Sequence, residues 1–289
     1  MHRDARFAKA AEFIWTHARL LERRVFACRF LDDDAQLVVN ALRAYQNRDG
    51  GFGHALEPDL RGPDSQPVFV DFALTTLREV GARDAEIGGR VCDFLASIAA
   101  PSGAVPAILA TAHQHPRAAH WNGDSALQPS LNFTSGIAGQ LHWQGIQHPW
   151  LERATAYCWA ELRNSVIGDA HSLRSALVFL DNFGGERRTR ELTEQLATQL
   201  PTADFFLADV PVTRYGLTPL HFAPSPRTPE RRLFSDSLIE AHLDDLAARQ
   251  AADGGWPIFW DAPGETARNE WRARWTLDAL SVLRAYGRL

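Results

Sequence analysis

Apolar residues recur every three to four positions along most of the chain, a spacing that predicts α-helices. In residues 35–46, the apolar side chains of Leu37, Val38, Leu42 and Tyr45 fall on one face of such a helix. The same periodicity is present in the segments 67–81, 84–100, 130–145, 149–165, 170–185, 188–200, 235–250 and 266–287. No series of alternating strand patterns accompanies them, so the sequence predicts an all-α protein.

Residues with known preferences for helix ends accompany several of these segments. Asp64 precedes the helix expected from Pro67, where its carboxylate could cap the first turn, and Gly81 is expected to end that helix. Ser130 stands at the start of another segment, and Pro149 occupies a first-turn position that proline tolerates well. These signals support the boundaries drawn from the apolar pattern.

The connections between the expected helices alternate between very short and long. The segments 81–84 and 184–187 are tight turns. The long connections are rich in Gly, Pro and aromatic residues, and they cover 47–64, 100–129, 200–232 and 251–267. Helix pairs joined in this way are typical of a repeated helical hairpin.

An internal repeat is present at the ends of two expected helices. The segments 42–53 (LRAYQNRDGGFG) and 246–257 (LAARQAADGGWP) share a Gln, three intervening residues and then Gly-Gly-aromatic, and 95–106 is a fainter copy. Glycines at these positions can adopt a positive φ and end the helix sharply. We expect Phe52 and Trp256 to pack back on their hairpins.

These two segments resemble the QW-type repeat of squalene cyclases and the GGFG repeat of protein prenyltransferase β subunits. The resemblance implies membership of the terpenoid cyclase superfamily and a single α/α toroid over 1–289, built from about five to six helical pairs around a central cavity. The segment 201–232 is expected to replace a regular inner helix. The residues that carry the resemblance are Gln46, Gly50, Gly51, Phe52 and Gly53, then Gln250, Gly254, Gly255 and Trp256.

The resemblance further implies an enzyme that acts on an isoprenoid or other apolar small molecule, by chemistry started by a carboxylic acid. The cyclases use a D-x-D-D motif, and the nearest string here is Asp32-Asp33-Asp34, where Asp33 or Asp34 is better explained as a helix N-cap. Prenyltransferases bind zinc through Asp, Cys and His, and no cysteine here has such partners. We therefore expect no metal and no cofactor.

Two alternatives remain open at this point. Toroids of this kind also host carbohydrate-active hydrolases and lyases, which would use paired carboxylates and an aromatic cleft. A non-catalytic member of the fold could instead bind a small molecule or a protein. The character of the central cavity would distinguish these possibilities.

The loop that follows the first copy of the repeat holds the first group of candidate site residues, because nothing in the second copy matches it. Glu57, Asp59 and Asp64 are predicted catalytic carboxylates, since burial raises a carboxyl pKa and suits it to general acid catalysis. Arg61 is expected to pair with Glu57 or Asp59. The residues expected to bind substrate here are His54, Arg61 and Gln66.

Further candidates lie in other loops and at helix starts. His120 is a predicted proton donor beside the aromatic Trp121. The pattern His113-x-His115 is too weak alone to indicate a metal site. The remaining residues expected to bind substrate are Asn132 and His171 at the starts of inner helices, and Trp260, Glu270 and Trp271 in an aromatic C-terminal segment.

Composition limits the class of protein. The net charge of −5 over 289 residues argues against a nucleic-acid binder. No signal-peptide pattern or membrane-length apolar run is present, so we expect a cytoplasmic protein. Its three dispersed cysteines are expected to be buried free thiols. The sequence leaves the oligomeric state open.

Overall fold

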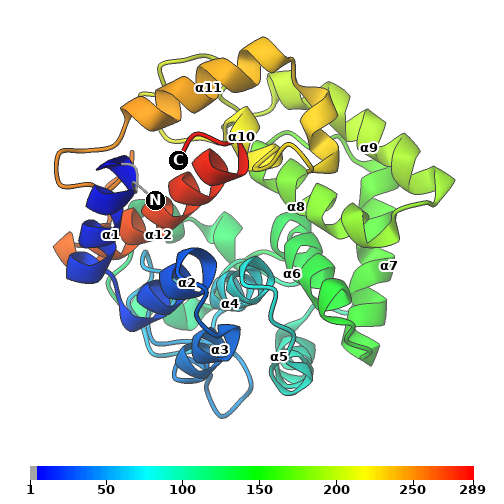
Figure 1. Ribbon diagram of the computed structural model, residues 1–289. Coiled ribbons are helices and arrows are strands. Elements are labelled where there is room, and N and C mark those ends of the chain that lie inside the picture. The colour runs from blue at the N-terminus through cyan, green and yellow to red at the C-terminus, as the bar shows by residue number, and fades with distance from the viewer. Residues whose placement is uncertain (1–4) are drawn as a thin grey trace. The chain divides into compact units, whose positions relative to one another are not determined.

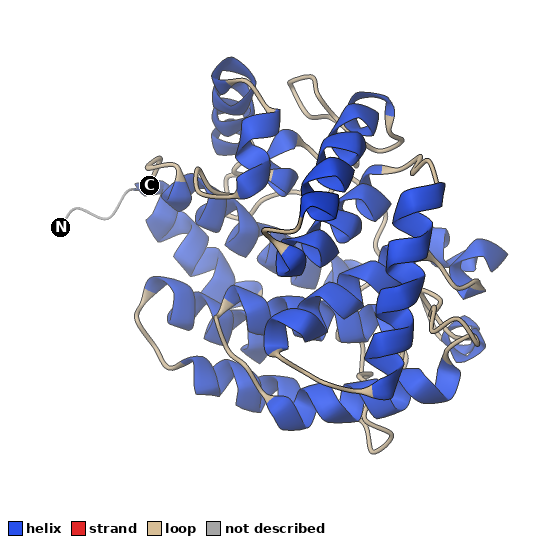
Figure 2. Ribbon diagram, turned by 90° about the vertical axis from the view of Figure 1, so that its right-hand side faces the viewer, coloured by secondary structure: helices blue, strands red, loops and turns tan. Residues whose placement is uncertain are grey.

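The computed structural model describes residues 5–289, and within that range it contains twelve α-helices and no strand (Figure 2). Isolated bridges between single residues are the only β-type pairings described there. The all-α prediction is therefore confirmed. The described chain divides into two compact units: Asp34–Ala203, and the residues up to Asp33 together with Asp204–Leu289.

The unit Asp34–Ala203 consists of two layers of helices. Its helices are α3 (Ala35–Arg43), α4 (Pro67–Glu79), α5 (Ala85–Ile98), α6 (Leu131–Gln144), α7 (Pro149–Asn164), α8 (Ala170–Leu180) and α9 (Arg187–Gln199). Helix α6 packs between α4 and α8, and α5, α7 and α9 lie along the outer side of this row (Figure 1). Within this unit the helices are thus arranged in two layers.

The most extensive helix–helix contact in this unit is between α6 and α8. Gly139 of α6 lies so near α8 that a Cβ at this position would be 2.8 Å from the carbonyl oxygen of Val178. Gly136, one turn earlier, faces the side chain of Ser175. These glycines let the two backbones approach and so bring the first turns of α6 and α8 together.

The other unit joins the two ends of the chain. Its helices are α1 (Ala5–His17), α2 (Leu20–Phe30), α10 (Pro219–Phe222), α11 (Asp236–Ala248) and α12 (Glu265–Ala285). Helix α12 packs against α1, α2 and α11. The segment 201–232 holds only the four-residue α10 and short 3-10 turns, so it contains no long helix.

The predicted repeat forms the same turn in all three copies. The side-chain amide of Gln46 donates to the carbonyl oxygen of Gly50 (3.0 Å), and that of Gln250 donates to the carbonyl of Gly254 (2.9 Å). Gly50, Gly103 and Gly254 have φ values of 91°, 90° and 93°. The faint copy around Gly103 is therefore a true structural repeat.

Each of these glycines also touches a neighbouring helix. A Cβ at Gly50 would lie 2.2 Å from the carbonyl oxygen of Arg90 in α5, and one at Gly254 would lie 2.2 Å from that of Lys9 in α1. At Gly103 it would lie 2.6 Å from the backbone nitrogen of Ala154 in α7. The repeat thus both ends one helix and seats it against another.

Most of the predicted helix-end signals are confirmed, and one is wrong. Asp34 caps α3 by accepting a hydrogen bond from the backbone of Gln36 (2.8 Å), and Pro149 begins α7. Gly81, with φ 69°, follows the end of α4. Asp64 does not cap α4: Pro67 forces the preceding residue into an extended conformation, so the N-cap is Gln66.

The three cysteines form no disulfide; Cys92 and Cys158 are buried and Cys28 is partly exposed. Burial raises the pKa of the Cys92 thiol to about 12, which keeps it protonated and unreactive. Among residues 5–289, no helix combines the length and the apolar character that crossing a bilayer requires.

Candidate functional site

Two loops that are distant in sequence are held together in the unit Asp34–Ala203. The backbone nitrogen of Ala118 donates to the carbonyl oxygen of Asp59 (2.9 Å), and that of Arg61 donates to the carbonyl of Pro116 (3.0 Å). Between them, Leu60 and Arg117 form an antiparallel bridge. This pairing places the residues just after Arg117, including His120, beside the loop that carries Glu57 and Asp59.

Glu57, Asp59 and His120 come together as a consequence, and we call them the carboxylate–histidine cluster. One side-chain ligand atom from each lies within 4.8 Å of the other two. His120 Nε2 is 3.6 Å from Asp59 Oδ2, and Glu57 Oε2 accepts a hydrogen bond from the Asp59 backbone (3.0 Å). The carboxylates are 5% and 2% exposed, whereas the His120 side chain is 49% exposed.

His120 lies beside an aromatic wall, as predicted. Its ring is 4.8 Å from that of Trp121, which in turn is 6.3 Å from Phe133 at the start of α6. His113 contacts the backbone carbonyl oxygen of Trp121 (3.1 Å) and so ties this loop down. Burial lowers the pKa of His120, which favours the neutral imidazole near neutral pH.

A second polar group forms where the first turns of α4, α6 and α8 meet. We call it the Asp71 cluster; its members, linked by a hydrogen bond, by proximity to Gly136 or by electrostatic interaction, are Asp71, Asn132, His171, Arg174 and Ser175. The Ser175 hydroxyl donates to Asn132 Oδ1 (2.7 Å). Asp71 Oδ1 and Ser175 Oγ lie 3.1 Å and 3.3 Å from the point where a Cβ on Gly136 would be. Glycine at that position thus lets the three helices share a polar junction.

The junction raises the pKa of the Asp71 carboxyl group. Burial raises its pKa to about 6, while the nearby positive charge of Arg174 acts in the opposite direction. A carboxyl group with this pKa holds its proton much closer to neutral pH than an ordinary aspartic acid does. Asp71 therefore has the property expected of a general acid.

His171 links the two clusters. Its pKa is lowered chiefly by burial, is raised by Asp169, and is lowered further by the charges of Arg174 and His120. The charges of Arg174 in one cluster and of His120 in the other thus both reach His171. The two clusters are therefore electrostatically coupled through His171.

Sequence reasoning identified Asn132 and His171 but missed Asp71 and Arg174. The signal was present, because Asp71 is a single carboxylate within an otherwise apolar run in 67–74. Arg174 likewise interrupts the apolar stretch of 173–180 at a position where a helix would pack against its neighbours. A charged residue in such a run indicates either a partner or a function.

The structure places four of the predicted loop residues outside the two clusters. Asp64 contacts His115 (3.2 Å) at a partly exposed position. Gln66 is buried, and its side chain bonds Thr111 and the backbone of Leu109, so it anchors the connection after α5. His54 is exposed, and Arg61 donates to the carbonyl oxygen of Pro58 (3.4 Å).

The remaining predicted residues belong to the other unit, where they form an aromatic group. Trp260 makes edge-on contacts with Trp271 (5.4 Å) and Trp275 (5.3 Å), which share a face of α12 as predicted. Trp260 also lines a hollow of about 500 Å³ with Asp261. Glu270 is buried, 3.8 Å from Arg19.

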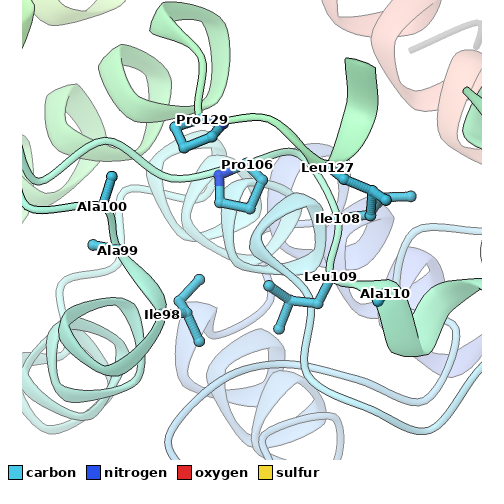
Figure 3. Close-up of a pocket in the computed structure, with 9 residues that line it drawn as sticks. All are labelled: Ile98, Ala99, Ala100, Pro106, Ile108, Leu109, Ala110, Leu127 and Pro129. Atoms are coloured by element: carbon cyan, nitrogen blue, oxygen red, sulfur yellow. The ribbon is translucent and has the colours of Figure 1, made fainter. Parts of the chain in front are cut away.

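A groove of about 370 Å³ opens on the unit Asp34–Ala203 (Figure 3). It lies between the end of α5 and the following connection, and its side chains are those of Ile98, Ala99, Ala100, Pro106, Ile108, Leu109, Ala110, Leu127 and Pro129. None of these is titratable, and none belongs to either polar cluster. The groove offers apolar surface, whereas the reactive groups lie in the clusters.

A scan of the chain against protein-family models found no match, and a search of the curated proteins found no similar sequence.

Proposed function

We propose that the protein is an enzyme that resembles terpenoid cyclases in fold and chemistry, and that Asp71 supplies the proton that starts its reaction. The observation that carries this proposal is the position of Asp71: a carboxyl with a pKa of about 6, at the junction of three helices, beside a polar site. It keeps the carboxylic-acid chemistry expected from the sequence but assigns it to a different residue.

The surroundings of Asp71 suit both halves of a proton transfer. When the protonated carboxyl gives its proton to a substrate carbon, the carboxylate that remains is stabilised by the positive charge of Arg174. A cation formed on the substrate would be attracted to the faces of aromatic rings. Trp121 and Phe133, whose rings are 6.3 Å apart in the same unit, would provide such rings.

An α/α toroid is the architecture that we propose for the whole chain. The support is the repeated turn at Gly50, Gly103 and Gly254, which seats α3 on α5, α5 on α7 and α11 on α1 within their respective units. The same contact between a turn and the neighbouring helix, repeated three times, is typical of a series of stacked helical hairpins.

The substrate that we propose is an isoprenoid or another mainly apolar small molecule. The apolar groove and the aromatic wall favour it, and the polar clusters would hold the end that reacts. A retaining glycosidase needs two carboxyls that flank the scissile bond. Glu57 and Asp59 are buried neighbours on one loop, so the carbohydrate alternative gains no support from them.

The test is incubation of the purified protein with a panel of prenyl diphosphates and squalene-like polyenes, with products detected by mass spectrometry. We expect a product with the native protein and at least about a 100-fold slower reaction with Asp71→Asn. Asp93→Asn is the matched control, because Asp93 is an exposed carboxylate on α5 that pairs with His148. A panel that gives no product, or an Asp71→Asn variant as fast as the control, would refute the proposal.

A further inference from the structure

We propose that Glu57, Asp59 and His120 bind a divalent ion of the first transition series, Mn²⁺ or Zn²⁺. The proposal uses the carboxylate–histidine cluster alone, so it does not depend on the role given to Asp71. It also departs from the sequence-based expectation that the protein uses no metal.

The distances within the cluster suit a metal site. Two ligand atoms that are each about 2.1 Å from one tetrahedral ion lie about 3.4 Å apart. His120 Nε2 and Asp59 Oδ2 are 3.6 Å apart, and all three ligand atoms lie within 4.8 Å of one another. Small rotations of the Glu57 and His120 side chains would bring the set to coordination distance.

Burial and charge favour a cation at this position. Two carboxylates that are almost completely buried so close together repel each other, and a divalent ion bound to both would offset that repulsion. The hydrogen bond from the Asp59 backbone to Glu57 Oε2 holds the second ligand in place, as outer partners do in metal sites.

The donor set selects the type of ion. Two carboxylate oxygens and one imidazole nitrogen suit Mn²⁺, Fe²⁺ or Zn²⁺, whereas Mg²⁺ and Ca²⁺ prefer oxygen ligands throughout. Three protein ligands leave coordination positions for water or for an oxygen of a bound molecule. The exposed edge of His120 indicates that such a molecule could reach the ion from solvent.

The other histidines of the same loop provide the contrast. His113 contacts the carbonyl oxygen of Trp121, and His115 contacts Asp64 at a partly exposed position. The His-x-His pair therefore does not converge on a common point with the buried carboxylates. The proposed ligand is the histidine that the bridge at Leu60 and Arg117 brings over Asp59.

The test is isothermal titration of the chelator-treated full chain with MnCl₂ and with ZnCl₂, alongside MgCl₂. We expect one Mn²⁺ or Zn²⁺ per chain, weaker binding of Mg²⁺, and a loss of affinity of about 100-fold or more in His120→Ala and in Asp59→Asn. His115→Ala is the matched control and should bind as the native protein does. Electron paramagnetic resonance of the Mn²⁺ complex should show coordinated nitrogen only while His120 is present.

Asp59→Asn alters a buried group and could unfold the loop, so His120→Ala, at an exposed side chain, keeps the proposal testable. No binding of Mn²⁺ or Zn²⁺ by the native protein, or equal affinity in His120→Ala and His115→Ala, would overturn it. Because the titration contains no substrate, failure here leaves the proton chemistry of Asp71 intact, and an inactive enzyme could still bind metal.

Discussion

Replacing Gly50 with alanine is expected to lower the free energy of unfolding by about 2–5 kcal/mol. The backbone of Gly50 has φ 91°, and a residue with a Cβ pays about 1–2 kcal/mol in left-handed conformations. The new methyl group would also lie 2.2 Å from the carbonyl oxygen of Arg90, and the displacement of α5 adds about 1–3 kcal/mol. Urea denaturation followed by circular dichroism measures the sum.

Gly81→Ala is the matched control for this prediction. Gly81 has φ 69°, but a Cβ there would meet no atom within 4 Å, so this variant carries the backbone cost without the clash. We expect it to lose about 1–2 kcal/mol. If the Gly50 and Gly81 variants lose the same amount, the seating of the repeat turn on its neighbour contributes nothing.

The repeat turn was predictable because its causes are local. A helix end, a residue with positive φ and an amide that closes the turn all lie within about ten residues, so the sequence pattern alone predicts the turn. Gln46 and Gln250 make the same bond to Gly50 and Gly254 for this reason. The contact of each glycine with a helix distant in the sequence could not be predicted, because it depends on tertiary packing.

The candidate site was predictable in its members more than in its geometry. Asp59 and His120 were both selected from the sequence, yet their proximity depends on the backbone pairing of two loops that are far apart in the chain. Asp64 was predicted as the N-cap of α4 because aspartate is a common capping residue. The N-cap is Gln66 instead, because Pro67 holds the residue before it in an extended conformation. Residue type and local sequence therefore predict candidate site residues, whereas the tertiary structure determines which of them lie close together.

Asp71→Asn is expected to act in opposite directions on activity and on stability. The variant keeps the shape of the side chain but cannot donate an acidic proton, so the rate of the proposed reaction should fall by about 10²–10⁴-fold. The same change removes a carboxylate whose ionised form is disfavoured by burial. Steady-state kinetics on any substrate found in the panel and denaturation of the same preparations measure the two effects.

The pH dependence of the free energy of unfolding shows whether Asp71→Asn raises or lowers stability. The pKa of Asp71 is about 6 in the folded protein and 3.8 in its ordinary state, so between these values the folded chain holds a proton that the unfolded chain has lost. The free energy of unfolding of the native protein therefore falls as the pH rises from about 4 to about 6, and it is flat with respect to this group above that range. Asparagine has no such titration.

The free energy of unfolding of Asp71→Asn, relative to that of the native protein, should accordingly rise by about 1–3 kcal/mol as the pH increases from 4 to 7. One pKa unit corresponds to about 1.4 kcal/mol, and the partial solvent exposure of Asp71 reduces the full effect. Below pH 4 the gain disappears because the native carboxyl is protonated in both states. The positive charge of Arg174 on α8, which acts on Asp71, is the same in both proteins. A difference between the two stability curves that does not change with pH would mean that Asp71 is an ordinary carboxylate, and would remove the physical basis for its role as the acid.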